Sequence, residues 1–171
     1  LKGDVSKALL ALLDYLSSIR ATLPVVRKDV DWDECADAAI VVDTILIQCH
    51  YETKSNEECA LLRIENSAHV KYVTKYLTQK GKFHDLITFY RSKRLHTSAL
   101  TFLKEHKDTL GIKEAVSYLK YLDSDNEALI LDNIQWIIDV DNKASLNMLK
   151  VMASKPEMNI SPEKVLAFLK T

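Results

Sequence analysis

The feature of this sequence that most constrains its fold is the scarcity of chain breakers: glycine and proline occur only three times each in 171 residues. Turns between β-strands depend on Gly, Pro and Asn, so a β-sandwich or barrel of this length would need many more of them. Apolar residues instead recur at intervals of three, four and seven along almost the whole chain, which is the period of an amphipathic helix. The sequence therefore predicts an all-α fold.

Capping signals and breaks divide this pattern into ten helices. Asp31–Glu34, Ser55–Glu58 and Ser124–Glu127 are typical of capping boxes, in which a polar N-cap and an acid three residues later satisfy the first N–H groups of a helix. Gly81 and Gly111 fall in predicted breaks between helices. The predicted helices cover residues 4–22, about 31–49, 55–63, 68–80, 83–92, 95–107, 112–122, 126–139, 142–154 and from about 161 onward.

A five-residue pattern suggests that the helices form repeats. A small residue, an aliphatic residue, any residue, a bulky apolar residue and Leu occur in that order at 99–103, 115–119 and 145–149. The small residue would let neighbouring helices approach closely, as in stacked helical repeats. The spacing of the copies is irregular, and a helical bundle could produce the same pattern. We expect an α-solenoid of stacked antiparallel helix pairs.

We expect residues 1–171 to be one segment of this solenoid, excised from a longer protein, because the chain begins with Leu1 and ends within an apolar helical pattern at Phe168 and Leu169. Internal repeats of a solenoid bury a face against a neighbour on each side, and terminal repeats usually carry a polar cap. The apolar ends of this chain have no capping repeat. They predict end-to-end self-association.

Motifs for catalysis and metal binding are missing from the sequence. The metalloprotease, nucleophile-elbow and P-loop patterns are absent. The three cysteines, Cys35, Cys49 and Cys59, have no paired spacing, so they predict neither a disulfide framework nor a zinc site. Their number and spacing are typical of thiols in a reducing compartment. We expect no enzyme activity, no bound metal, no cofactor and no small-molecule substrate.

Charge is arranged in blocks, although the net charge is only −1. Residues 29–65 carry ten acids and two bases, residues 71–107 nine bases and two acids, and residues 108–142 eight acids and two bases. Blocks along the sequence of a solenoid become blocks in space, because each repeat contacts only its neighbours. We call residues 71–107 the basic band. It is either a set of solvated helix faces or a patch that attracts an acidic partner.

Five cations of the basic band are the candidate partner-binding residues. If helices 68–80 and 83–92 are an antiparallel pair, the cations at the start of the first helix and at the end of the second meet at one end of the pair. An alternative is a nucleic-acid-binding helical repeat, because Tyr72, Tyr76 and Tyr90 interleave with the cations and could stack on bases. Tyrosines packed in the core beside lysine stems explain the same pattern. The five candidate partner-binding cations are Lys71, Lys75, Arg91, Lys93 and Arg94.

Three stretches resemble one protein family. FHDLITFYRSKRLHTSALTFLKEH at 83–106 is similar to the clathrin-type repeat of vacuolar sorting proteins, in which a Tyr-x-x-Lys-x-Leu-His turn precedes Ala-Leu. Residues 115–150 and PEKVLAFLK at 162–170 resemble the continuation, with weaker matches at 8–16 and 61–66. The family includes vacuolar protein sorting subunit thirty-nine of the HOPS tethering complex and the TGF-beta-receptor-associated protein. Residues 24–58 lie outside the resemblance and are interpreted as a variable insertion.

The resemblance implies a clathrin heavy-chain-repeat-like solenoid and a role in membrane tethering. This segment would be a scaffold that holds other HOPS-type tethering subunits during fusion of late endosomes with lysosomes or vacuoles, and the full-length protein would bind a Rab GTPase on late endosomes. The expected location is cytoplasmic and peripheral on these membranes. The family motifs consist of packing residues, so the resemblance assigns no contact to a particular residue.

Overall fold

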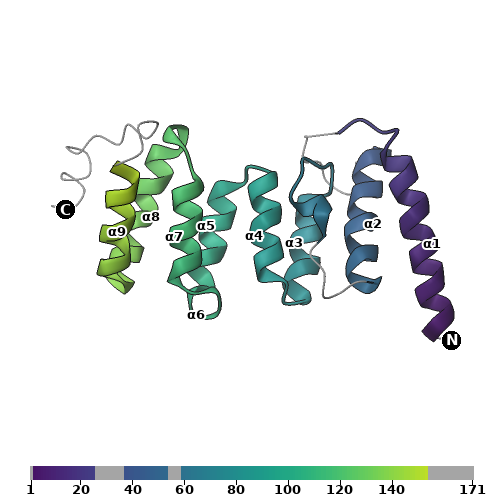
Figure 1. Cartoon of the computed structure of the whole chain (residues 1–171), viewed down its shortest axis with the longest axis horizontal. Helices are drawn as coiled ribbons and strands as arrows, with labels where there is room; N and C mark the ends of the chain where they lie inside the picture. The colour runs from purple at the N-terminus through teal and green to yellow at the C-terminus, as the bar shows by residue number, and fades with distance from the viewer. Residues whose placement is uncertain (1, 26–36, 54–58, 154–171) are drawn as a thin grey trace. The chain divides into compact units, whose positions relative to one another are not determined.

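The fold is all-α, as predicted. The computed structural model describes residues 2–25, 37–53 and 59–153. Within these ranges every regular element is a helix (Figure 1). The α-helices are α1 (Lys2–Arg20), α2 (Ala38–Thr53), α3 (Val70–Gln79), α4 (Phe83–Ser92), α5 (His96–Glu105), α6 (Lys107–Leu110), α7 (Ile112–Tyr121), α8 (Glu127–Val140) and α9 (Asn142–Ala153), and two 3-10 helices are η2 (Ala60–Leu62) and η3 (Ser124–Asn126).

The chain divides into two compact units, Leu1–Leu95 and His96–Thr171. In the first unit α1 packs on α2, α2 on α3 and α3 on α4; in the second, α5 packs on α7, α7 on α9 and α8 on α9. The pairs α1–α2, α3–α4 and α8–α9 run antiparallel (Figure 1). Antiparallel pairing within each unit agrees with the expectation, while the solenoid and the treatment of 1–171 as a single segment stay predictions.

The core of the first unit begins where α1 meets α2. Leu16, Val42 and Leu46 are buried together, and Ile40 and Ile47 are almost fully buried along the same helix. The β-branched run at Ile40–Val42 therefore lies within a helix, α2. The partly buried side chains that pack against the cluster are Leu13, Ile19, Leu23, Ile45 and Leu61.

One side of α1 is apolar and exposed. Val5, Leu12 and Tyr15 lie along it, with 60%, 39% and 62% of their surfaces accessible. The face of α1 that meets α2 runs instead through Leu13 and Leu16. Self-association through exposed apolar ends stays a prediction.

The start of α2 and the segment after it differ from the prediction. Asp37 Oδ1 accepts from the backbone N–H of Ala39 at 2.9 Å, so α2 begins after Asp37, and the predicted box at 31–34 lies outside the described residues. The box at 55–58 lies outside them too. The predicted helix up to residue 63 is wrong in its described part, because only the 3-10 turn η2 forms after Cys59. The Asn66 amide donates to the carbonyls of Leu61 and Ile64 at 3.0 Å, and such local side-chain bonds compete with helix.

Two boundaries in the second unit also differ. The predicted helix 95–107 ends at Glu105, and α6 follows as a separate turn. His106 lies at this break, and its ring stacks on Phe102 with 4.0 Å between centroids. The predicted capping box at 124–127 is wrong: η3 occupies its first three residues and α8 begins at Glu127. Asn126 directs its amide to Asp123 Oδ1 at 2.6 Å instead of capping α8.

Candidate protein-interaction site

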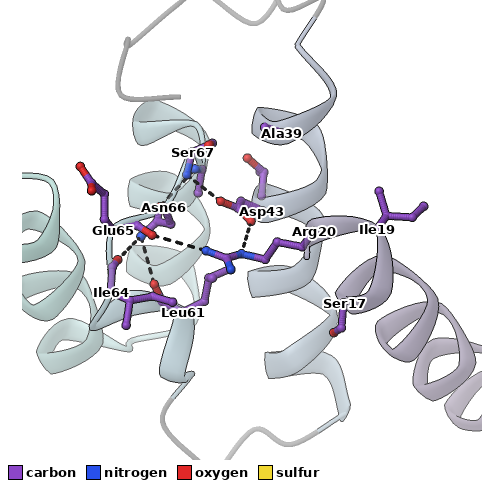
Figure 2. Close-up of polar contacts among 12 residues, drawn as sticks. Ser17, Ile19, Arg20, Ala39, Asp43, Leu61, Ile64, Glu65, Asn66 and Ser67 are labelled. Atoms are coloured by element: carbon purple, nitrogen blue, oxygen red, sulfur yellow. Dashed lines mark hydrogen bonds and ion pairs between the residues drawn. The ribbon is translucent and has the colours of Figure 1, made fainter. Parts of the chain in front are cut away.

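A polar junction in the first unit joins α1, α2 and the turn before α3 (Figure 2). Asp43 of α2 is only 3% exposed. Its Oδ1 accepts from Arg20 Nε of α1 at 2.7 Å, and its Oδ2 accepts from the backbone N–H of Ser67 at 2.6 Å. Arg20 Nη2 also donates to the Glu65 carbonyl at 3.4 Å. One buried carboxylate therefore fixes three segments of the chain.

Asn66 organises the turn from within. It is 2% exposed, and besides its two donated bonds its Oδ1 accepts from the backbone N–H of Ala68 at 3.1 Å. A buried amide that is hydrogen-bonded on both sides holds its backbone in one conformation, because any other arrangement leaves polar groups unsatisfied. The turn is consequently held in one conformation at the start of α3. We call residues 61–69 the platform.

His69 caps α3. Its ring Nδ1 accepts from the backbone N–H of Tyr72 at 3.1 Å, and its backbone N–H donates to Thr44 Oγ1 of α2 at 2.8 Å. An N-cap side chain accepts one of the unsatisfied N–H groups of the first helical turn. The sequence did not indicate this role, since histidine is not among the common N-caps.

The end of α4 lies beside this platform. Lys93, which follows α4, donates from Nζ to the Asn66 carbonyl at 2.7 Å, and the same Nζ lies 5.8 Å from the centre of the Phe89 ring. The start of α3 and the end of α4 are at the same end of the antiparallel pair (Figure 1). This is the arrangement on which the predicted meeting of the two cation groups depends.

The structure separates the five candidate cations into two kinds. Lys71, Lys75 and Arg94 are exposed. Arg91 and Lys93 are half-buried, with Arg91 Nε inaccessible to solvent and Lys93 bound to the platform. We call Lys71, Lys75 and Arg94 the basic surface. Binding of a partner by any of the five stays a prediction.

Arg94 adopts a backbone conformation that favours glycine. Its φ is +56°, compared with +68° for Gly81, and both residues follow a helix that ends in the same way. Lys82 N–H bonds to Leu77 O at 2.9 Å after α3, and Leu95 N–H bonds to Tyr90 O at 2.9 Å after α4. This is the Schellman pattern, whose left-handed position is usually Gly. A non-glycine residue there costs about 1 kcal/mol or more.

The tyrosines of the basic band connect helices. Tyr72 donates to Gln48 Oε1 and Tyr76 to Glu52 Oε1, each at 2.9 Å, which ties α3 to α2. Tyr90 is buried. Burial and the bond to Glu52 raise the pKa of Tyr76. Base stacking needs exposed ring faces. The burial of Tyr90 and the bonds of Tyr72 and Tyr76 to α2 favour the packing interpretation over nucleic-acid binding, although Tyr72 is 37% exposed.

We expect Glu52 to give the stability of the first unit a pH dependence below pH 4.5. Hydrogen bonds from Lys80 (2.8 Å) and Tyr76 hold the pKa of Glu52 below its ordinary value of 4.5. A carboxylate with a lowered pKa in the folded state stabilises fully above its unfolded pKa and loses that contribution as pH falls. Thermal unfolding measured from about pH 6 to pH 2 should show a steeper fall for the wild type than for Glu52→Gln. The difference should stay below about 1 kcal/mol, because the pair is exposed. Equal slopes would exclude this role.

The structure describes two of the three cysteine thiols, and their positions disfavour thiol reactivity. Cys49 and Cys59 are buried, and burial, with a smaller contribution from Glu52, raises the pKa of the Cys49 thiol; a raised pKa disfavours the reactive thiolate. Cys35 lies outside the described residues. Among the described residues there is no group of three or more His, Cys, Asp or Glu side chains arranged for a metal ion. None of the described helices is long and apolar enough to cross a membrane.

Comparison with known families gives a match over just over half of each unit. The family model described as "Vacuolar sorting protein 39 domain 1" matches residues 42–138, more than half of the chain. The matched range contains the stretch at 83–106 from which the resemblance was inferred. It includes α2 from Val42 onward. This part of α2 lies within the proposed insertion at 24–58, and that insertion stays a prediction.

Curated relatives carry the same name. The "Vacuolar protein sorting-associated protein 39 homolog" of Drosophila melanogaster is 28% identical over 85% of this chain and 17% of its own length. The human "Vam6/Vps39-like protein" is 28% identical over 98% of this chain and 21% of its own length. The Caenorhabditis elegans homolog is 27% identical over 99% of this chain and 21% of its own length. The chain spans about a fifth of the length of these relatives.

No solved structure matches the chain. The family assignment therefore depends on the family model and agrees with the curated relatives. Both confirm the resemblance inferred from the sequence: this chain belongs to the family described as vacuolar sorting protein 39 domain 1.

Proposed function

We propose that this chain is a scaffold segment of a membrane-tethering subunit and that it holds another subunit of the complex. Family membership supports a role in vacuolar sorting. The observation that supports a docking role most directly is the basic surface, in which Lys71 and Lys75 lie four residues apart on α3 and Arg94 follows α4. Exposed cations attract a partner of opposite charge, so this surface is complementary to an acidic partner.

The proposed setting is the fusion of late endosomes with lysosomes or vacuoles. There the chain would work within a longer subunit that is peripheral on the membrane, and the full-length subunit would reach a Rab GTPase through parts beyond this segment. The platform at 61–69 supports such a role, because charges presented on a rigid base lose less conformational entropy on binding.

Reversing the charges of the basic surface should strongly weaken partner binding without unfolding the chain. In the triple variant Lys71→Glu, Lys75→Glu, Arg94→Glu we expect an unchanged circular dichroism spectrum and a free energy of unfolding within about 1 kcal/mol of the wild type, because exposed substitutions usually cost little. Recovery of tethering subunits from lysate on the immobilised chain should fall at least about tenfold, because three reversed charges would place like charges opposite an acidic partner.

Lys113→Glu provides a matched control, because Lys113 is an exposed lysine of α7 in the second unit. It should leave recovery unchanged. Equal recovery by the triple variant and the wild type would contradict the proposal. Steeply salt-dependent binding of unrelated RNA that is lost in the triple variant would favour the nucleic-acid alternative for the basic band at 71–107, because phosphate contacts release counterions.

A further inference from the structure

A pocket of about 340 Å³ opens at the C-terminal end of α4, and the lining residues that the structure describes belong to the first unit. Its volume is near the lower limit of ligand sites, roughly 300–1,000 Å³, so it fits one or two side chains of a partner segment. The lining residues are Glu65, Asn66, Ser92, Lys93 and Arg94.

Arg94 is the cation of this pocket that is available to a ligand. Lys93 Nζ is already bonded to the Asn66 carbonyl. Arg94 is exposed, and no side-chain partner for it exists among the residues that the structure describes. Its left-handed backbone sets the direction in which its side chain leaves the end of α4. A guanidinium presents several N–H donors in a fixed fork that matches the two oxygens of a carboxylate.

Among the described lining residues, Ser92 and Glu65 offer acceptors to a ligand. Ser92 Oγ donates its proton to the Phe89 carbonyl at 2.9 Å, so towards a ligand it can only accept. The Glu65 carboxylate accepts as well. The side chain of Asn66 is occupied by the turn. A complementary ligand therefore combines a carboxylate with nearby N–H donors, as an Asp or Glu side chain on an extended peptide does.

We propose that this pocket binds an acidic protein segment, with a carboxylate on the Arg94 guanidinium and main-chain N–H groups on Glu65 and Ser92. The inference rests on the proposed function and specifies how the basic surface recognises its partner. Phosphate groups fit less well, because their oxygens are acceptors and leave Glu65 and Ser92 without donors. The phosphate groups of nucleic acids and anionic lipids are disfavoured for the same reason.

The test is an NMR titration of the ¹⁵N-labelled chain with the capped peptide Gly-Glu-Asp-Glu-Gly. We expect saturable shifts of the Arg94 side-chain N–H and of the backbone amides of Glu65 and Lys93. The peptide Gly-Gln-Asn-Gln-Gly should bind at least about tenfold more weakly, because it lacks the charge that strengthens the hydrogen bonds. Separate titrations use inorganic phosphate and phosphatidylserine vesicles in place of the peptide. Binding of either that equals or exceeds the acidic peptide would overturn the inference.

Arg94→Gly is the decisive variant, since glycine suits the left-handed position and the fold should persist. It should weaken binding of the acidic peptide at least about tenfold, the loss of one bidentate charge-assisted contact. Lys113→Gln, in the second unit, should leave that binding unchanged. Undiminished binding by Arg94→Gly overturns the inference. If Arg94→Gly retains the tethering subunits while Lys71→Glu with Lys75→Glu loses them, the pocket proposal fails and the proposed function stands; if both variants retain them, both fail.

Discussion

Asp43→Ala should lower the free energy of unfolding of the first unit by about 3 kcal/mol. The substitution removes the acceptor of the buried Ser67 N–H, and an unsatisfied buried donor costs about 1–3 kcal/mol. It also removes the partner of Arg20; breaking a buried ion pair costs about 3–5 kcal/mol. Because the Arg20 side chain is 27% exposed, water compensates part of this second cost, and the total should lie near the lower end.

Urea denaturation followed by circular dichroism measures this loss. Asp14→Ala is the matched control, an exposed aspartate on α1 whose removal should change stability by less than about 0.5 kcal/mol. The double variant with Arg20→Ala should be less destabilised than the sum of the two single variants by about 1–3 kcal/mol, since the two side chains interact directly. Exact additivity would show that the 2.7 Å contact contributes no coupling.

Tyr118→Ala should destabilise the second unit by about 4 kcal/mol. Tyr118 is fully buried, and removing a large aromatic side chain from a core costs about 3–5 kcal/mol through lost contacts and the cavity left behind. Its hydroxyl lies 2.9 Å from His96 Nδ1 of α5, so the alanine variant also loses a bond between α5 and α7.

Tyr118→Phe separates these two contributions, because it keeps the ring and removes only the hydroxyl. We expect a loss of about 1 kcal/mol from this variant, the usual net contribution of one hydrogen bond. Hydrogen exchange of the α7 amides should report both losses locally. Equal losses in the two variants would mean that the hydroxyl, and not the packing of the ring, dominates.

The helices of this fold were predictable where apolar period and chain breaks agree. The helix predicted at 83–92 is observed with the same limits, and the one at 112–122 is one residue shorter. Gly81 and Gly111 both have positive φ, so the breaks expected at these positions have a backbone reason. The spacing of apolar residues and the residue types that favour turns are local properties, so short stretches of sequence are enough to predict them.

The ends of the helices were less predictable, because they depend on contacts with distant segments. His69 caps α3 while its own N–H is bonded to Thr44 of α2, and Asn66 replaces a predicted helix by a turn. Both side chains are buried. No local pattern contains that information, and tertiary context overrides propensity in such cases.

The candidate site was predictable in composition but not in geometry. The sequence indicated five cations at one end of a helix pair; the structure leaves three of them exposed. Lys93 differs from its neighbours because a carbonyl 27 residues away lies within reach of its Nζ. The left-handed conformation of Arg94 was missed as well, since glycine is the residue that usually signals it.

The bonds around the 61–67 turn also have a consequence for the order of folding. They join residues 23, 24, 27 and 45 positions apart, whereas the backbone hydrogen bonds within an α-helix join residues four positions apart. Long closures cost more chain entropy than short ones, and contacts between distant residues slow folding. During synthesis α1 and α2 emerge first, but the turn cannot acquire its last bond until Lys93 has left the ribosome. The first unit should therefore reach its native state only when α4 is complete.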